Sequence, residues 1–272
     1  MTTDQQQTES DPDDRAEAQP QSERDGQSQQ SSVGFERCRG CLREAIEFLH
    51  ENLPEDLRQT LIEEFGIETS ILNTRKVGYL EEPDSLLQAL LDAGFPPQTI
   101  LATGLATVPG IEQTTAKEPI NSDDLTPTID PSTSLLTFPH QDTTGEWCFI
   151  GGIRPSVLPS ARSPPPECNE SWIPITNIAP QSNDMVIEEV PFGAETIHEG
   201  TPVIVTRDPL TALALQQLQI PSISIPMFDI DRVGESVNDV VESASTVFCV
   251  AAQAGAAHGT EERITPLLRI AK

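Results

Sequence analysis

Basic residues are scarce in this chain, and lysine is nearly missing. The 272 residues include 43 Asp and Glu against 16 Lys and Arg, for a formal net charge of -27; the lysines are Lys76, Lys117 and Lys272. Such a chain repels nucleic acid at long range. The acids are scattered rather than gathered in one tail, which favours a protein of a high-salt, halophilic cytoplasm where salt screens this repulsion. An acidic regulatory or inhibitory protein of an ordinary cell is the alternative.

Long apolar runs are missing as well. No stretch approaches the roughly 20 apolar residues that span a membrane, and the charged start and apolar run of a signal peptide are absent. We therefore expect a soluble, cytoplasmic protein. Residues 1–32 contain no Ile, Leu, Val or Phe. They cannot bury enough surface to offset the entropy of ordering, so we predict a disordered acidic tail.

The sequence also lacks the motifs of several common enzyme classes. It has no pair of histidines four residues apart, no Gly-x-Ser-x-Gly, no Walker loop and no Gly-x-Gly-x-x-Gly. These absences remove support for metalloproteases, triad hydrolases, P-loop enzymes and dinucleotide-binding enzymes. His140, which follows Pro139, is interpreted as a surface histidine at a strand end rather than a catalytic base.

The clearest pattern that is present lies between residues 202 and 226. Val203 to Val205 form a β-branched run, Leu210 to Leu218 carry apolar residues at helical spacing, and Ile220 to Ile225 alternate apolar residues with serine. This order of strand, tight loop, helix and strand predicts one βαβ unit, and hence two parallel strands in a buried sheet.

Other segments indicate helices and a hairpin upstream of this unit. Apolar stripes predict one helix over 57–65 that ends at Gly66, and a second over 86–93 that ends at Gly94. Strands at 135–138 and 147–150, separated by a Thr-Thr-Gly turn, indicate a hairpin whose pairing Pro139 limits.

At the loop after Val205 the sequence resembles the TOPRIM domain of bacterial-type DNA primases. That family reads roughly Thr-Glu-Gly and then Asp-Ala at this loop. Here Thr206 matches, but Arg207 holds the glutamate position, Asp208 the glycine position and Thr211 the aspartate position. The resemblance therefore implies a TOPRIM fold without its general acid/base glutamate.

The family's second acidic motif, an Asp-x-Asp usually followed by Ala-Gly, falls near residue 250. Ala254 and Gly255 match the Ala-Gly, which puts the two aspartate positions on Val250 and Ala252. Because Mg²⁺ needs hard oxygen ligands and phosphoryl transfer needs the metal, these replacements predict a degenerate active site without nucleotidyl transfer. An Asp-x-Asp at Asp229 and Asp231 is the candidate for a relocated magnesium site.

Two further pieces are similar to the primase core in the expected order. In the first, Gly78 and Tyr79 end a strand, a helix follows over 86–93, and Thr103 to Leu105 form a Thr-Gly-Leu turn. In the second, Phe138 and Pro139 lead into Asp142, Gly145 and a glycine-rich strand that ends at Arg154. Together the pieces cover roughly residues 42–268.

The CRGC sequence of Cys38 to Cys41 resembles half of the zinc finger that precedes the primase core. Zinc needs four ligands, and residues 1–37 hold no Cys or His. His50 or a second chain could complete a site; an unmetallated cysteine pair at a helix start is the alternative. Since the five cysteines are odd in number and no export signal is present, disulfides are not expected.

These observations predict an α/β protein with an α+β N-terminal subdomain followed by a TOPRIM-like parallel-sheet subdomain. The expected divisions are the tail at 1–32, the helical part of the core at 33–105, a linker at 106–133, a β-rich segment with a proline-rich loop at 134–183, and the TOPRIM-like domain at 184–272.

Three functions are compatible with this sequence. The first is a non-catalytic, replication-associated or nucleic-acid-binding relative of primase, whose partners are replication proteins or single-stranded nucleic acid and whose phosphate contacts are Arg154 and Arg207. The second is an active primase-type nucleotidyltransferase with relocated acids. The third is an acidic protein-interaction module unrelated to replication. Magnesium and zinc are the candidate cofactors.

Overall fold

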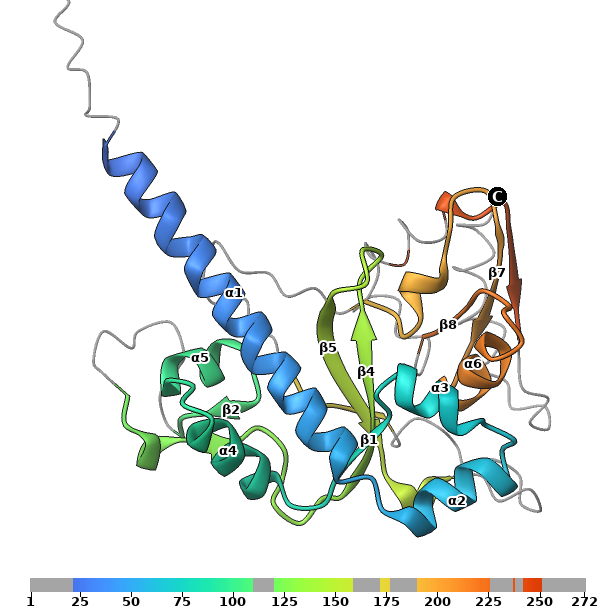
Figure 1. The fold of residues 1–272 in the computed structure, drawn as a ribbon, viewed down its shortest axis with the longest axis horizontal. Coiled ribbons are helices and arrows are strands. Elements are labelled where there is room, and N and C mark those ends of the chain that lie inside the picture. The colour runs from blue at the N-terminus through green and yellow to red at the C-terminus, as the bar shows by residue number, and fades with distance from the viewer. Residues whose placement is uncertain are drawn as a thin grey trace, which may run out of the picture.

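A computed structural model describes residues 22–109, 120–158, 172–176, 190–225, 237 and 242–250. We call the described residues up to 176 the first lobe and those from 190 onward the second lobe. Figure 1 shows the long helix α1 crossing the first lobe, with the second lobe on the far side of the strands β4 and β5. The α-helices are α1 (Ser22–Glu51), α2 (Glu55–Glu63), α3 (Thr69–Thr74), α4 (Pro83–Asp92), α5 (Pro97–Ala102) and α6 (Pro209–Gln216).

The strands form three sheets among the described residues. They are β1 (Gly78–Leu80), β2 (Ala106–Thr107), β3 (Thr126–Pro127), β4 (Leu135–Gln141), β5 (Trp147–Ile153), β6 (Trp172–Pro174), β7 (Pro202–Thr206), β8 (Ser222–Ser224) and β9 (Thr246–Cys249). Short 3-10 turns lie at Ser122–Asp124, Pro155–Val157 and Ala194–Thr196, the last of which is η5. Within the described part, no helix is both long and apolar enough to cross a membrane.

The two helices predicted upstream form where the sequence places them. Helix α2 is followed by Gly66 at a φ of 66°, and α4 is followed by Gly94 at a φ of 85°. Such left-handed positions favour glycine, which has no Cβ to clash with the backbone. The apolar stripes face inward, since Leu61, Leu86 and Leu90 are buried.

The first lobe is built around an antiparallel sheet of order β1-β4-β5-β6. The predicted hairpin is present as β4 and β5, and its turn closes through a hydrogen bond from the Gly145 N–H to the Asp142 carbonyl at 2.9 Å. On the other side of β4, β1 pairs only with residues 135–137. Pro139, which has no N–H to donate, thus lies beyond the end of β1, as the sequence indicated.

Helix α1 lies against this sheet, and the contact with β1 is very close. A Cβ atom added to Gly78 would lie 2.6 Å from the backbone carbon and oxygen of Leu49 on α1. Its core face carries Cys41, Leu42, Ala45, Ile46 and Leu49, all buried together with residues of α4 and α5. The glycine therefore fixes how closely the longest helix approaches the sheet.

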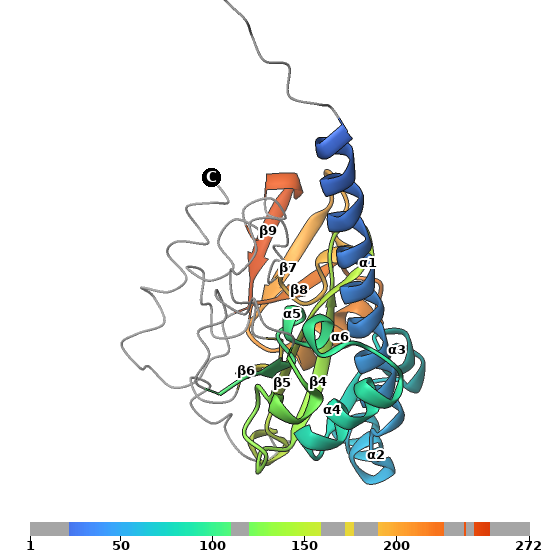
Figure 2. The same cartoon turned by 90° about the vertical axis from the view of Figure 1, so that its left-hand side faces the viewer.

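The second lobe contains the βαβ unit that the sequence predicted. Strands β7 and β8 are parallel and are connected by α6, while β9 pairs in parallel with the other side of β7, giving the order β8-β7-β9 (Figure 2). Val203, Val205, Ile223 and Val247 contribute to the core on one face of this sheet. The α/β fold class is confirmed.

The lobes share a buried apolar cluster. Leu61, Leu72 and Phe138 of the first lobe pack with Phe192 and Leu213 of the second. Polar contacts reinforce this contact, because the side-chain amide of Gln217 donates to the Gly66 carbonyl at 2.9 Å and its oxygen accepts from the Glu68 N–H at 3.0 Å. We expect the lobes to act as one packed unit.

Two predicted segments overlap regular structure. Helix α1 begins at Ser22, inside the segment 1–32 interpreted as a tail, whereas residues 1–21 lie outside the described residues. The segment 106–133, interpreted as a linker, contains the antiparallel pair of β2 and β3 and the buried side chains of Leu125 and Ile129.

Gly78→Ala tests the close contact between β1 and α1. The added methyl meets backbone atoms that cannot move aside, so we expect a loss of about 1–3 kcal/mol in the free energy of unfolding, measured by denaturant titration in molar KCl. Gly34→Ala is the matched control. Nothing lies within 4 Å of a Cβ at this helical position, and we expect a gain of up to about 1 kcal/mol. Equal effects at both positions would contradict the close contact.

Candidate functional site

The candidate site lies where the parallel strands of the second lobe end. In the register of β7 and β9, Val205 is opposite Cys249, and the Val250 N–H donates to the Val205 carbonyl at 2.9 Å. The loop that begins at Arg207 and the residue Val250 therefore leave the sheet at the same edge. In open α/β sheets this carboxyl edge is where ligands bind. The structure thus brings together the loop at Arg207 and the residue Val250, both of which the sequence singled out.

Asp208 has a structural role at this edge. Its carboxylate accepts a hydrogen bond from the Thr211 N–H at 2.8 Å and another from the Thr211 hydroxyl at 2.7 Å. Asp208 is thus the N-cap of α6, with Pro209 at the first helical position. Because the cap places a carboxylate at the positive end of the helix, this end is not available to a phosphate group.

The residue that precedes this loop is also held by hydrogen bonds. Thr206 is buried, and its hydroxyl lies 2.9 Å from the Asp208 carbonyl and 3.1 Å from the Ile223 carbonyl. The loop from Thr206 to Thr211 is therefore closed on itself by its own side chains. Arg207, at the glutamate position of the resemblance, is half-buried between these residues.

The second strand end carries apolar side chains. Val250 is 43% exposed and Phe248 is 56% exposed, whereas Val247 and Cys249 on the other face of β9 pack against the core of the lobe. Valine offers no oxygen ligand to a cation. Among the described residues, no group of three or more Cys, His, Asp or Glu is placed to hold a metal ion.

Three of the candidate site residues named from the sequence lie outside the described residues. They are Ala252, at the second aspartate position, and Asp229 and Asp231, the proposed relocated pair. The described chain leaves β8 through Ile225, whose N–H donates to the Thr206 carbonyl at 3.1 Å. The segment with Asp229 and Asp231 therefore starts from the same edge of the sheet as Arg207.

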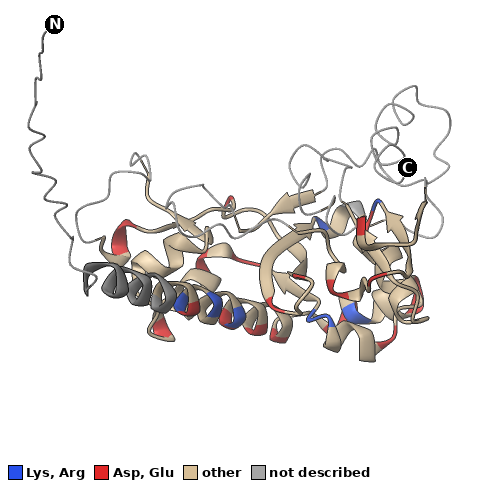
Figure 3. Ribbon diagram, turned by 90° about the horizontal axis from the view of Figure 1, so that it is seen from above, with Lys and Arg blue, Asp and Glu red and all other residues tan. Residues whose placement is uncertain are grey.

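The two arginines proposed as phosphate contacts belong to different lobes. Arg154 is exposed after β5, where its charge contributes to the lowered pKa of Asp130, after the larger effect of hydrogen bonds from Ser132. Arg207 lies at the strand edge of the second lobe. Helix α1 carries Arg37, Arg39 and Arg43, and Figure 3 shows basic segments on this helix and at several places elsewhere in the protein.

Cys38 and Cys41 lie within α1 rather than at a helix start, and both face the core. Burial raises the pKa of both thiols, that of Cys41 to about 12. Zinc binds the thiolate, so this environment disfavours the metal-binding form. His50 lies nine residues after Cys41, about 14 Å along a helix that rises 1.5 Å per residue, and its Nδ1 is 2.7 Å from the Val77 carbonyl. His50 therefore does not complete a site with these cysteines, and zinc binding with a second chain stays a prediction.

His140 is not the surface residue that the sequence suggested. It is 1% exposed on β4, and its Nδ1 lies 2.6 Å from the carbonyl oxygen of Val190. The expectation was wrong because the start of the second lobe and β6 cover this end of the hairpin. Since the sequence does not reveal which segment returns to a strand end, position next to proline was a poor guide to exposure.

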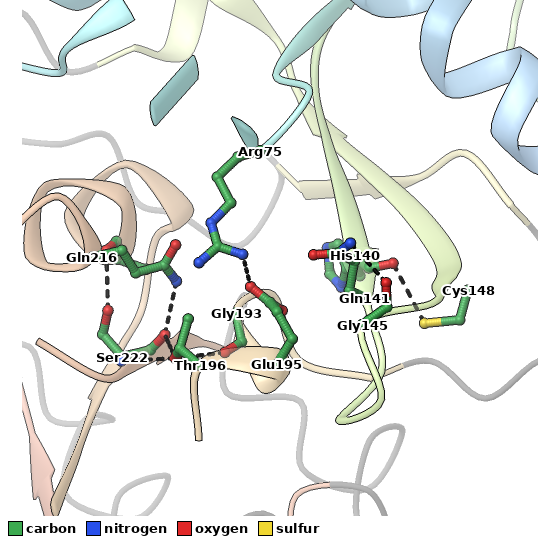
Figure 4. A network of polar contacts seen from close by, with 11 residues as sticks. Arg75, His140, Gln141, Gly145, Cys148, Gly193, Glu195, Thr196, Gln216 and Ser222 are labelled. Carbon is green, nitrogen blue, oxygen red and sulfur yellow. Dashed lines mark hydrogen bonds and ion pairs between the residues drawn. The ribbon is translucent and has the colours of Figure 1, made fainter. Parts of the chain in front are cut away.

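Sequence reasoning also missed a polar network between the lobes (Figure 4). Arg75, after α3, forms an ion pair with Glu195 of η5, and the two side chains are 14% and 13% exposed. Nearby, the Gln216 amide donates to the Ser222 carbonyl at 2.9 Å, and the Ser222 hydroxyl donates to the Ala212 carbonyl at 3.0 Å. No local pattern marks the pair of Arg75 and Glu195, because its members are distant in the chain, whereas the bonds of Gln216 and Ser222 lie within the second lobe.

Comparisons with known proteins identify the fold. No protein-family model matches the sequence, and no curated protein matches it. Among solved structures, the Aquifex aeolicus primase, with its zinc-binding and RNA polymerase domains, aligns at a TM-score of 0.57 and 17% identity, covering 86% of this chain and 52% of that one. The E. coli primase catalytic core aligns at 0.55 and 12% identity, covering 86% and 67%.

A third structure with this fold is the RNA polymerase domain of Mycobacterium tuberculosis primase DnaG, in complex with a double-stranded DNA oligomer that has a 6-nucleotide overhang. It aligns at a TM-score of 0.56 and 14% identity, covering 86% of this chain and 67% of that one. The chain thus spans about half of the Aquifex protein and about two thirds of the other two. Its structural neighbours are bacterial DnaG primase catalytic cores, and at this identity the likeness concerns the fold.

The role of Asp208 can be tested by substitution. Asp208→Ala removes both hydrogen bonds to Thr211, so we expect a loss of about 1 kcal/mol in the free energy of unfolding. Asp208→Asn keeps an oxygen that accepts from the Thr211 N–H and should stay within a few tenths of a kcal/mol of the wild type. If Asp208 instead held a cation, magnesium would raise the melting temperature of the wild type and not that of Asp208→Asn.

Proposed function

We propose that this protein is a primase-like, replication-associated protein that binds nucleic acid or a replication partner and does not catalyse nucleotidyl transfer. One observation carries the proposal. The ends of β7 and β9 meet at one edge of the parallel sheet, where the TOPRIM resemblance puts the metal-binding acids, and the side chains of Arg207, Thr211 and Val250 occupy three of those positions. Asp208, the described carboxylate in this loop, caps α6.

The chemistry of magnesium supports this proposal. Nucleotidyl transfer uses metal ions to neutralise the charge that develops on phosphate oxygens, and Mg²⁺ is held by carboxylates together with substrate phosphates. An arginine and a valine supply no ligand. The guanidinium of Arg207 instead suits a phosphate group, to which it can donate two hydrogen bonds. This edge of the sheet would then bind a nucleic acid backbone without acting on it.

An active primase-type enzyme with relocated acids is the second candidate. The observation in its favour is that the chain leaves β8 at the same edge as Arg207, on its way to Asp229 and Asp231. Two carboxylates that reached this edge would be the number that magnesium sites commonly use.

Magnesium binding separates the two candidates. We expect no specific heat of binding when Mg²⁺ is titrated calorimetrically into the protein in molar KCl, with or without single-stranded DNA and nucleotides, and no primer synthesis. A binding isotherm that Asp229→Ala/Asp231→Ala removes would overturn the proposal in favour of the enzyme. Asp84→Ala/Asp123→Ala, which removes two exposed carboxylates of the first lobe, controls for the change in net charge.

Binding of single-stranded DNA tests the phosphate contacts. We expect Arg207→Ala and Arg154→Ala each to weaken binding and to lower the slope of log K against log salt by about 0.7. Arg58→Ala is the control, because Arg58 pairs with Glu55 on its own helix at 3.6 Å. Fluorescence anisotropy from low to molar salt provides the slopes. If no variant and no wild-type protein binds DNA, and magnesium does not bind either, the protein is an interaction module outside nucleic-acid chemistry.

A further inference from the structure

His140 is a buried titratable residue that the proposed function does not use. It lies near the end of β4, and its ring contacts Phe149 of β5, Trp172 of β6 and Phe192 at the start of the second lobe, with ring centroids 4.8, 5.6 and 5.6 Å away. The contacts with Phe149 and Phe192 are edge-to-face. The ring of His140 thus connects β5 and β6 of the first lobe with the start of the second lobe.

The hydrogen bond of His140 sets its tautomer. The Val190 carbonyl can only accept, so the Nδ1 atom 2.6 Å away must carry the hydrogen and donate. Nε2 is then an unprotonated acceptor, and it is buried without a hydrogen-bond partner in the described part of the chain. A second proton would have to enter at Nε2, among aromatic rings.

Among the described residues, no unpaired charged side chain lies beside the ring to stabilise that proton. The titratable side chains on the elements around the ring are Cys148 of β5, whose thiol donates to the backbone carbonyl of His140 at 3.5 Å, and Glu195 of η5, which pairs with Arg75. Figure 4 shows Cys148 and Glu195 on either side of His140. An aromatic face contributes roughly 0.5–2 kcal/mol to a nearby cation, while an unpaired charge in an apolar interior is far more costly.

The residues around His140 also form part of the contact between the lobes. Val190 and Phe192 begin the second lobe, and Phe192 exchanges two backbone hydrogen bonds with Ser224 of β8, at 3.2 and 2.8 Å. Phe192 packs against Phe138 of β4 as well, at a centroid distance of 5.8 Å. If the ring of His140 leaves the aromatic cluster, the contact between the lobes loses the hydrogen bond to Val190 and the aromatic contact with Phe192.

We propose that His140 holds the antiparallel sheet and the second lobe together and that its protonation releases this contact. Proton uptake at Nε2 expels the ring from the aromatic cluster and frees the segment from Val190 to Phe192. In the closed state the ring is buried, Nδ1 donates to the Val190 carbonyl, and Nε2 carries no hydrogen. In the open state both nitrogens carry a hydrogen and face water. One proton from solvent balances the change, and no other group reacts.

The direction of the pH dependence follows from the burial of the ring. Desolvation lowers the pKa of His140 from 6.5 to about 4, against the smaller opposing effect of the hydrogen bond to Val190. His140 is neutral in the closed state of the protein and charged in the open state. Its contribution to the stability of the closed state is therefore fully present above pH 6.5. That stabilisation is lost as the pH falls from 6.5 towards 4, and the ratio of open to closed molecules rises about tenfold for each pH unit.

Hydrogen exchange at several pH values, corrected for the intrinsic rate, tests the release. Amides of the segment 190–197 are held by the bonds of Phe192, Ala194, Thr196 and Ile197. We expect their protection to fall about tenfold between pH 6 and pH 5 in wild type, while that of α4 stays constant. His140→Asn, which retains a donor for Val190 but does not titrate here, should abolish this dependence. His198→Asn, at an exposed histidine of the same lobe, should leave it unchanged.

Two outcomes would overturn the proposed release by protonation of His140. The first is an equal loss of protection in α4 and in the segment 190–197, which would mean that acid unfolds the whole protein. The second is the same pH dependence in His140→Asn as in wild type, which would assign it to carboxylates. If His140→Asn fails to fold, NMR of histidine-labelled wild type decides. An Nδ1–H tautomer with a depressed pKa at His140 supports the proposal, whereas titration near 6.5 without increased exchange excludes it.

Discussion

The arrangement of the protein depends on the close approach of β1 to α1, which only a glycine allows. Gly78 brings the backbone of the sheet against Leu49, and the residues just before it attach this strand to its surroundings. Lys76 donates to Glu47 on α1 at 2.6 Å, and Arg75 pairs with Glu195 of the second lobe. One short segment thus sets the position of the long helix, the sheet and the second lobe. Because β4 pairs with β1 in the sheet, the strand that carries His140 is positioned by the same contacts.

The loop at the candidate site is held in its conformation by its own side chains. A metal-binding loop places carboxylates where they repel one another until a cation neutralises them. Here the carboxylate of Asp208 is satisfied by the N–H and hydroxyl of Thr211, and the hydroxyl of Thr206 closes the loop on its own backbone. The loop therefore needs no ion to be stable. This self-contained arrangement is what a scaffold requires if its role is to present Arg207 rather than to hold magnesium.

Local patterns in the sequence predicted the local structure well. The βαβ unit, the hairpin and the helices before Gly66 and Gly94 all follow from periodicity and turn chemistry, and the structure confirms them. The convergence of Arg207 and Val250 followed from the resemblance, because the ends of parallel strands meet at one edge. Burial of His140 and the pairing of Arg75 with Glu195 could not be foreseen, since both depend on which distant segments cover a strand end. Such contacts are set by packing between elements, and no short motif encodes them.

Because acidic residues far outnumber basic ones, the ion pairs of the few Lys and Arg side chains matter for how the protein holds together. In the described residues, Arg75 is committed to a largely buried ion pair, Lys76 to Glu47, and Arg39 to the hairpin carboxylates of Asp142 and Glu146 at 3.9 and 3.8 Å. Exposed pairs at such distances contribute little to stability, and salt weakens them further. The largely buried pair is screened much less, so it should continue to hold the lobes together when the salt concentration is raised. High salt would equally suppress the repulsion between this surface and a nucleic acid. Under the proposed function, binding of a nucleic acid would then depend on short contacts at a few arginines rather than on a broad basic groove.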